Sequence, residues 1–177
     1  MSDRDTEFTD FVAAHRTKGR RAAYLLCGDW GLAEDIVQQA LIKLYLAWSR
    51  VRPEGAEGYL RRIIGRTAIN EWRSASRRRT VPDDTLVDLV DEKAPLAYEE
   101  RSVLLDALQQ LPARQRQIVV LRHCWGCSVA EVAKDLHIST GTVKSQTSRA
   151  LERLNTILSA PHVMPAESAG HGRNGRP

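Results

Sequence analysis

The chain has 177 residues, 42% of them hydrophobic, enough for one large domain or two small ones with packed cores. The formal net charge of +4 permits an anionic partner without requiring one, so the placement of the positive charge matters more than its sum. No apolar run is long enough to cross a bilayer, and the polar, acidic first residues give no sign of a secretory signal, so we expect a cytoplasmic protein.

Between Glu7 and Arg79, hydrophobic residues recur at intervals of three and four, which predicts a series of helices. Residues 27–31, Cys-Gly-Asp-Trp-Gly, interrupt this spacing and predict a turn. After the turn, an unbroken apolar stripe predicts one amphipathic helix: it consists of Ala33, Ile36, Val37, Ala40, Leu41, Leu44, Tyr45 and Trp48. Acidic and amide groups lie off this stripe near its start, where acids suit the helix dipole: Glu34, Asp35, Gln38 and Gln39.

A loop is predicted over residues 52–58, and a third helix follows it. Its buried side is expected to hold Leu60, Ile63, Ile64, Ala68 and Trp72. Its exposed side is expected to hold Arg61, Arg62, Arg66, Asn70 and Arg73, with Arg77, Arg78 and Arg79 following. Such a face can hold a phosphate backbone, with Tyr59 and Trp72 available to stack on an unpaired base. The alternative is a solvated basic face whose aromatic residues belong to the core, and for Trp72 burial is the favoured interpretation.

A change in composition separates this segment from the next. Prolines and acidic residues predict a flexible linker over residues 80–97. We hypothesise that its acids cover basic surfaces in the free protein: Asp83, Asp84, Asp88, Asp91 and Glu92. Residues 159–177 hold little to bury and are predicted to be disordered. The expected domains are therefore residues 1–79 and 98–158.

Four helices are predicted over residues 98–158. Pro112 is expected to open the second of them, which would run through Leu121. Ser128, with Glu131 three residues later, predicts a capping box at the start of the third. A tight turn at residues 137–139 leads to the last helix near Thr140. The turn position, often glycine, is His137, which tolerates a positive φ at some cost.

The last two helices fit a helix-turn-helix. Ala133 is the small residue where the two helices cross, and Val143 is the apolar anchor of the second helix on the first. Polar and basic residues face outward, as a helix in the major groove requires: Lys144, Ser145, Gln146, Ser148 and Arg149. The alternative is an ordinary helical hairpin with a solvated charged face.

Residues 25–40, LLCGDWGLAEDIVQQA, resemble the region 2 core of the extracytoplasmic-function (ECF) sigma factors of the sigma-70 family, most of all the actinobacterial sigma-E-like subfamily. Residues 59–73 resemble the promoter-reading end of that region, and residues 111–154 resemble region 4. The resemblance covers nearly everything from Phe8 to Leu158. It implies an all-α protein of two small helical domains joined by a flexible linker, which binds core RNA polymerase and directs promoter-specific transcription initiation.

The resemblance also implies roles for individual residues. Glu34, Asp35, Gln38 and Gln39 would dock on the clamp helices of the polymerase β′ subunit. Arg61, Arg62, Arg66, Asn70 and Arg73 would engage the promoter −10 element, with a loop near Arg66 helping to capture a flipped base. Lys144, Ser145, Gln146, Ser148 and Arg149 would read the −35 element, and Arg114, Arg116 and Arg122 would contact phosphates nearby. Region 4 would also bind the polymerase β flap, and an anti-sigma factor is a possible further partner.

Two features point elsewhere and are given less weight. Cys124 and Cys127 form a lone C-x-x-C, which could bind zinc with a histidine or switch by disulfide formation. Without a second cysteine pair we expect free thiols, including Cys27, and neither metal nor cofactor. The sequence contains neither a phosphate-binding loop nor a nucleophile elbow, so it gives no indication of an enzyme. Two rival functions stay open: a helix-turn-helix regulator that binds an operator alone, and a protein-interaction module such as an anti-sigma mimic.

Overall fold

The computed structural model describes residues 3–78 and 98–159, and within these ranges the chain is helical, as predicted. The proposed linker, 80–97, lies outside the described residues, as do 160–177 of the predicted tail and Arg79. The hypothesis that the acidic linker covers basic surfaces therefore falls on residues outside this description. Within the described residues, no helix is both long and apolar enough to span a membrane.

An N-terminal bundle is formed by α1 (Asp3–Cys27), α2 (Trp30–Ala47) and α3 (Pro53–Arg78). The predicted turn between the first two helices is confirmed and is short. Gly28 adopts φ 83°, and Asp29 caps α2 by accepting a hydrogen bond from the Leu32 amide at 2.6 Å. The loop predicted over residues 52–58 is wrong beyond Arg52, because α3 already begins at Pro53. A proline is tolerated in the first helical turn, where an amide hydrogen would have no helical acceptor.

A C-terminal domain is formed by α4 (Tyr98–Gln109), α5 (Ala113–Val119), the π-helical turn η1 (Val120–Cys124), α6 (Val129–Leu136) and α7 (Thr140–Ser159). Pro112 lies just before α5 rather than inside it, and the helix predicted to run through Leu121 widens into η1 at Val120. The capping box of Ser128 and Glu131 is present, and His137 adopts φ 54° in the left-handed region, as expected at the turn. The predicted helix-turn-helix is therefore α6, its turn and α7.

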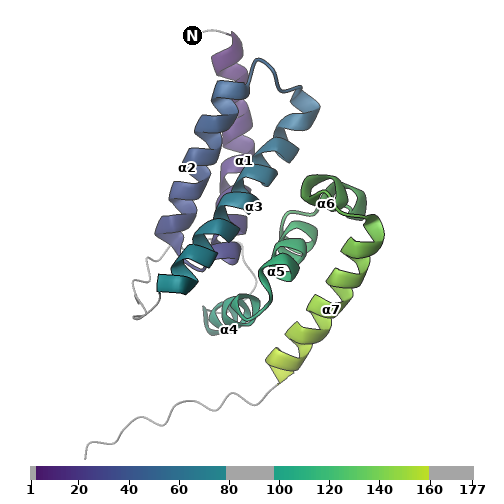
Figure 1. Ribbon diagram of the computed structural model, residues 1–177. Coiled ribbons are helices and arrows are strands. Elements are labelled where there is room, and N and C mark those ends of the chain that lie inside the picture. Colours follow the sequence, from purple (N-terminus) through teal and green to yellow (C-terminus); the bar gives the residue numbers. More distant parts are fainter. Residues whose placement is uncertain (1–2, 79–97, 160–177) are drawn as a thin grey trace, which may run out of the picture.

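The two bodies pack on one another instead of standing apart (Figure 1). The main core runs without a break from Leu26, Ile36 and Leu60 of the N-terminal bundle to Ile118 and Val132 of the C-terminal domain. In Figure 1, α3 lies beside α5 and α6, and contacts also join α1 to η1 and α4. A second, smaller core lies between α4, α5 and α7. The relative position of the two bodies is thus fixed by apolar packing that the sequence pattern alone does not reveal.

Candidate nucleic-acid interface

The outward face of α7 carries most of the residues predicted to read DNA. Val143 is fully buried against α6, which turns the opposite side of α7 to solvent. Lys144, Ser145, Ser148 and Arg149 are exposed there, while Gln146 is half-buried and accepts a hydrogen bond from Gln115 at 3.1 Å. The helix begins beside Ser139, whose Oγ accepts from the Thr142 amide at 3.0 Å. The free protein therefore presents a polar, basic helix end of the kind that enters a major groove.

The arginine-rich side of α3 is divided between solvent and interior. Arg66, Asn70 and Arg73 are exposed, as predicted, and Arg62 is half-buried. Arg61 was expected on the exposed side of this helix, but only 7% of it is exposed. The face that the sequence predicted as one surface is thus interrupted where α6 covers it.

Arg61 lies in a cluster of carboxylates from both bodies. Its Nε donates to Asp135 Oδ2 of α6 at 2.9 Å, and its terminal nitrogens lie 3.6 Å from Glu57 of α3 and 3.6 Å from Glu131. Burial opposes the charge on Arg61, but the hydrogen bond to Asp135 and the neighbouring acids outweigh it and hold the pKa of Arg61 above its ordinary value. A direct contact between Arg61 and DNA requires α6 to move away.

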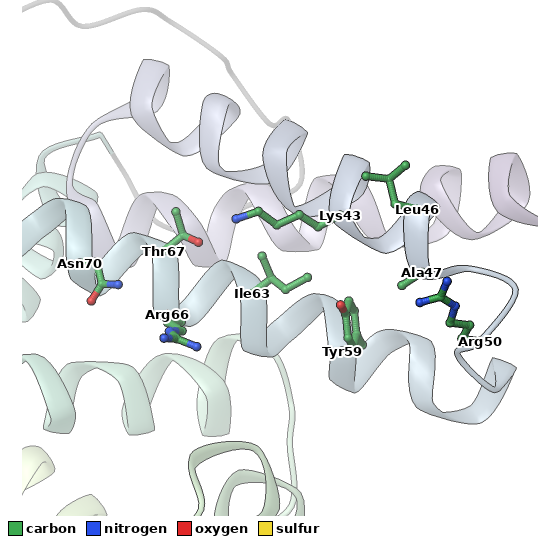
Figure 2. Close-up of a pocket in the computed structure, with 9 residues that line it drawn as sticks. All are labelled: Lys43, Leu46, Ala47, Arg50, Tyr59, Ile63, Arg66, Thr67 and Asn70. Carbon is green, nitrogen blue, oxygen red and sulfur yellow. The ribbon is translucent and has the colours of Figure 1, made fainter.

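A hollow of about 640 Å³ lies between the C-terminal part of α2 and the middle of α3 (Figure 2). Sequence analysis missed its cations Lys43 and Arg50, which come from α2 and the turn after it. In Figure 2, Lys43 extends toward Thr67, whereas Tyr59 and Arg50 stand at the other end of the hollow. An aromatic ring beside cationic groups suits a base and its phosphate. Lys43 lies off the apolar stripe and Arg50 just after its end, and these positions are the signal that could have identified the two cations. The lining residues are Lys43, Leu46, Ala47, Arg50, Tyr59, Ile63, Arg66, Thr67 and Asn70.

The three arginines predicted to contact phosphates occupy different environments. Arg114 is exposed, and its guanidinium donates to the Leu136 carbonyl at 2.9 Å. Arg122 is half-buried and donates to the carbonyl of Cys127. Arg116 is fully buried, with its guanidinium 4.1 Å from the ring centroid of Trp72 and a hydrogen bond to Gln109. Of the three, Arg114 is the one that solvent reaches freely, and a phosphate contact by Arg116 requires the two bodies to separate.

The outer face of α2 combines polar and apolar groups. Asp35, Gln38 and Gln39 are exposed, while Glu34 is half-buried between Arg16 and Arg20 of α1. The hydrogen bond from Arg16 holds the pKa of Glu34 below its usual range. Sequence analysis missed the apolar groups on this helix: Ile42 is 61% and Leu46 72% exposed. Both lie off the predicted core stripe, which is the signal that could have identified them as surface residues.

The C-x-x-C motif contributes to the packing between the two bodies. Among the described residues, no group of His, Cys, Asp and Glu side chains is arranged to hold a metal ion. Cys124 is exposed, whereas Cys127 is buried, and burial raises the pKa of its thiol to about 11. Trp125, between the two cysteines, is buried and donates from Nε1 to Glu57 at 2.7 Å. The motif thus places an aromatic ring against the N-terminal bundle.

Comparison with known proteins agrees with this geometry. Residues 11–78 match the family profile "Sigma-70 region 2", and residues 101–154 match "Sigma-70, region 4". The RNA polymerase sigma-E factor of Streptomyces avermitilis is 36% identical over 153 residues, covering 86% of this chain and 85% of that protein. The ECF RNA polymerase sigma factor SigL of Mycobacterium tuberculosis is 33% identical over 146 residues, covering 78% and 81% of the two chains.

Solved structures share the fold. The sigma factor RpoE of Bartonella quintana, in complex with the anti-sigma factor NepR, superimposes with a TM-score of 0.72 at 23% identity, covering 88% of this chain and 98% of that one. CnrH, in complex with the cytosolic domain of CnrY, gives a TM-score of 0.70 at 22% identity, covering 89% and 90%. The arrangement of helices in this chain is therefore also found in these two solved structures.

Proposed function

The chain belongs to the ECF sigma factors of the sigma-70 family, and from that premise we propose which of its surfaces contact promoter DNA and RNA polymerase. The protein is an RNA polymerase sigma factor that directs transcription initiation, and it is not an enzyme. Its place of action is the cytoplasm, where polymerase and promoter meet. Residues 1–79 act as region 2 and residues 98–158 as region 4, with 80–97 as the connecting linker.

The outward face of α7 reads the −35 element. Lys144, Ser145, Ser148 and Arg149 are exposed on one helix whose opposite side is fixed by Val143, and this exposure is the observation that carries the proposal. Polar and basic side chains on such a helix reach base edges, and basic groups also hold phosphates. Gln146 joins them by exchanging its bond with Gln115 for a base contact. Arg114 and Arg122 are the neighbouring phosphate contacts.

The exposed side of α3 and the hollow beside it bind the −10 element. Arg66, Asn70 and Arg73 supply cationic and amide groups at the surface, and Arg62 adds a partly exposed guanidinium. The hollow between α2 and α3 takes up an unstacked base, with Tyr59 as the stacking surface, Arg50 beside its phosphate and Lys43 at the other end for a neighbouring phosphate. Extracting a base costs a few kcal/mol, and stacking on an aromatic ring returns about 1–3 kcal/mol. Arg61 joins this surface once the bodies separate, and Arg116 of α5 then joins the phosphate contacts beside α7.

The outer face of α2 docks on the β′ clamp helices of polymerase. Asp35, Gln38 and Gln39 supply polar contacts, Glu34 extends them, and Ile42 and Leu46 continue the same helix with apolar area. Exposed apolar side chains beside polar groups are characteristic of protein-binding surfaces. The C-terminal domain binds the β flap. An anti-sigma factor is a further partner, since related folds are found in complexes such as RpoE with NepR.

The test is transcription in vitro with core RNA polymerase, this protein and a template library of random upstream sequences, followed by mapping of start sites. The expected result is initiation downstream of two recurrent sequence elements at a fixed spacing, because two weak DNA-binding domains on one polymerase act at high effective concentration. With the double variant Lys144→Ala/Arg149→Ala, initiation should no longer depend on the sequence of the upstream element. It should still depend on the sequence of the downstream element. Binding to DNA without polymerase-dependent transcripts would instead support a regulator that acts by itself.

A further inference from the structure

A second hollow lies where α3 of the N-terminal bundle meets α5 and α6 of the C-terminal domain. Its volume of about 530 Å³ falls in the range of small-molecule sites in proteins, about 300–1,000 Å³. Arg66 lines this hollow as well as the one in Figure 2, where it lies on the side of α3 away from Lys43. We term the second hollow the interdomain groove, since both bodies supply its walls. Its lining residues include Tyr59, Arg62, Arg66, Asn70 and Arg73 of α3, Arg114 and Gln117 of α5, and Asp135 of α6.

The arginines of α3 form one row along the groove. Arg66 follows Arg62 by four positions and precedes Arg73 by seven, and both intervals bring side chains to the same face of a helix. The row extends about 16 Å along the helix axis, at about 1.5 Å per residue. A single phosphate group can contact only part of a row of this length. The row therefore suits a ligand that carries several phosphates.

Positive charge exceeds negative charge in the groove. Among the described residues that line it, four are arginines and one, Asp135, is an acid. Only 3% of the Asp135 side chain is exposed, and its oxygens lie 2.9 Å from Nε of Arg61 and 3.4 Å from Nη1 of Arg62. Its charge is thus largely balanced by these partners. Arg66 is exposed and has no ion pair within the described part of the chain, so the groove attracts anions.

A buried amide group adds a neutral polar contact. Gln117 of α5 is only 7% exposed and lines the groove. Its amide nitrogen occupies space that Gly65 of α3 leaves open, since a Cβ at position 65 would lie 2.8 Å from it. The amide has no hydrogen bond to any residue that the structure describes, although buried polar groups are normally paired. A bound molecule with donors and acceptors of its own would satisfy this amide.

Arg114 and Tyr59 supply the remaining contacts. Arg114 donates to the Leu136 carbonyl at 2.9 Å, which anchors its guanidinium beside the groove. A guanidinium has five N–H donors, so most of those of Arg114 remain for a ligand. The ring of Tyr59 lies beside the guanidinium of Arg62, at 5.9 Å from ring centroid to Cζ. An aromatic ring among arginines suits a nucleobase whose phosphates lie nearby.

We propose that the interdomain groove binds a small phosphorylated ligand of the nucleoside polyphosphate class. The guanidinium groups of Arg66 and Arg114 hold its phosphates, as guanidinium forks do for phosphate oxygens generally. The amide of Gln117 and the ring of Tyr59 contact its base. Because Arg66 and Arg114 belong to different bodies, one ligand molecule contacts both. Arg66 also belongs to the proposed −10 surface, so the ligand competes there with the promoter strand, and this last step alone rests on the proposed function.

Calorimetric titration of the full chain tests the proposal without DNA or polymerase. The probes are GTP, ATP, pyrophosphate and guanosine, in buffer with a chelator so that no divalent cation shields the phosphates. A nucleoside triphosphate should bind at a single saturable site. Pyrophosphate, which lacks the base, should bind at least about tenfold more weakly, since one or two lost contacts cost this much. Guanosine, which lacks the phosphates, should not bind measurably.

Four variants locate the site. Arg66→Ala and Arg114→Ala remove one guanidinium from each body, and each should weaken triphosphate binding by at least about tenfold. Gln117→Met keeps an unbranched side chain of similar length without the amide, so it should weaken triphosphate binding but not pyrophosphate binding. Arg153→Ala is the matched control, because it removes the same charge from an exposed position of α7 that does not line the groove. Circular dichroism confirms that each variant stays helical.

Several results would overturn the proposal. One is the absence of saturable triphosphate binding, and another is pyrophosphate binding of equal strength. An equal loss in Arg153→Ala would indicate general attraction of anions only, and a loss in Arg66→Ala but not in Arg114→Ala would remove the C-terminal domain from the site. A short thymidylate strand that binds through both arginines where the triphosphates do not would assign the groove to DNA. Failure of the proposed function is seen separately, as absence of transcripts with core polymerase, and leaves the calorimetry unchanged.

Discussion

The two surfaces proposed to read promoter DNA are presented differently by the free protein. On α7, four of the five predicted residues are exposed, and Val143 holds the helix on α6 within the same domain. On α3, exposed arginines alternate with Arg61, which is buried by the other domain. The first surface is exposed in the free protein, whereas Arg61 of the second is covered by the other domain.

The difference teaches that positive charge on a helix has two uses. The described contacts give Arg66 no part in holding the two bodies together. Its side chain is exposed and available to an anionic ligand. Arg61, five residues earlier on the same helix, joins α3 to α6 through Asp135. A basic residue in the sequence can therefore either face solvent, where an anionic ligand can reach it, or join the two domains. Which of the two occurs depends on whether an acidic residue of the other domain lies opposite.

The largest expected effect separates Arg61 from Arg66. Arg61→Ala leaves Asp135 buried without its main partner and should lower the free energy of unfolding by about 3–5 kcal/mol, as for other broken buried pairs. Arg66→Ala, at an exposed position, should change it by less than about 0.5 kcal/mol while weakening transcription. Urea denaturation of the full chain measures the first quantity. Equal stabilities of the two variants would remove the distinction drawn between these arginines.

The next prediction tests whether the exposed face of α7 reads DNA without any rearrangement of the protein. Lys144→Ala/Arg149→Ala should reduce transcription from a promoter with an intact −35 element by roughly 30-fold or more, since each of the two contacts is worth about 1–3 kcal/mol. Arg153→Ala is the control, an exposed arginine further along α7. Heparin-challenged transcription assays give the ratio. A loss of the same size from the control would indicate general charge attraction in place of base reading.

Most of the local structure was predictable because its causes are local. The capping box of Ser128 and Glu131 joins residues three positions apart, and the left-handed turn at His137 follows from the helix-turn-helix spacing. The apolar stripe of α2 likewise predicted its buried side, apart from Tyr45, which is 39% exposed, so the exposure of Asp35, Gln38 and Gln39 followed. In each case the interacting groups lie within one or two helical turns.

The packing of the two bodies on one another was not predictable, because the residues that form it are distant in sequence. Arg61 and Asp135 are 74 positions apart, and no periodicity links them. Trp125 drew attention only as part of a C-x-x-C, although its ring packs on the N-terminal bundle. The start of α3 at Pro53 was also missed, because proline and glycine usually mark a loop even though proline fits a first helical turn.

A smaller effect concerns the outer face of α2, which is exposed in the free protein, as the outward face of α7 is. Leu46→Ser should weaken binding to core RNA polymerase by roughly tenfold, because burying an exposed leucine is worth about 1.5–3 kcal/mol. Asp10→Ser, at an exposed polar position on α1, should leave the affinity unchanged. Fluorescence titration with core polymerase measures both. Unchanged binding of Leu46→Ser would confine the docking surface to the polar residues nearer the start of α2.

The smallest effect is the response of the domain contact to acid. Burial opposes the charge of Glu57, but the hydrogen bond from Trp125 and the nearby Lys18, Arg61 and His15 outweigh it, so the pKa of Glu57 lies below its ordinary value of 4.5. A carboxylate with a depressed pKa stabilises the packed state above its ordinary pKa, and this stabilisation is lost as the pH falls through the lowered value. The packing of the two bodies should therefore persist from pH 7 to about pH 5 and weaken below about pH 4.5.

Small-angle X-ray scattering measured from pH 7 to pH 3.5 tests this expectation, with Glu57→Gln as the matched variant. The amide can still accept the hydrogen bond from Trp125 but cannot be protonated in this range, so the variant should be slightly more open at pH 7 and should respond less to acid. Hydrogen bonds from Ser128 also lower the pKa of Glu131, and the acid response of that carboxylate is what the variant retains. An identical pH profile for both proteins would place the acid response outside Glu57 and would limit the role of this carboxylate to orienting Trp125.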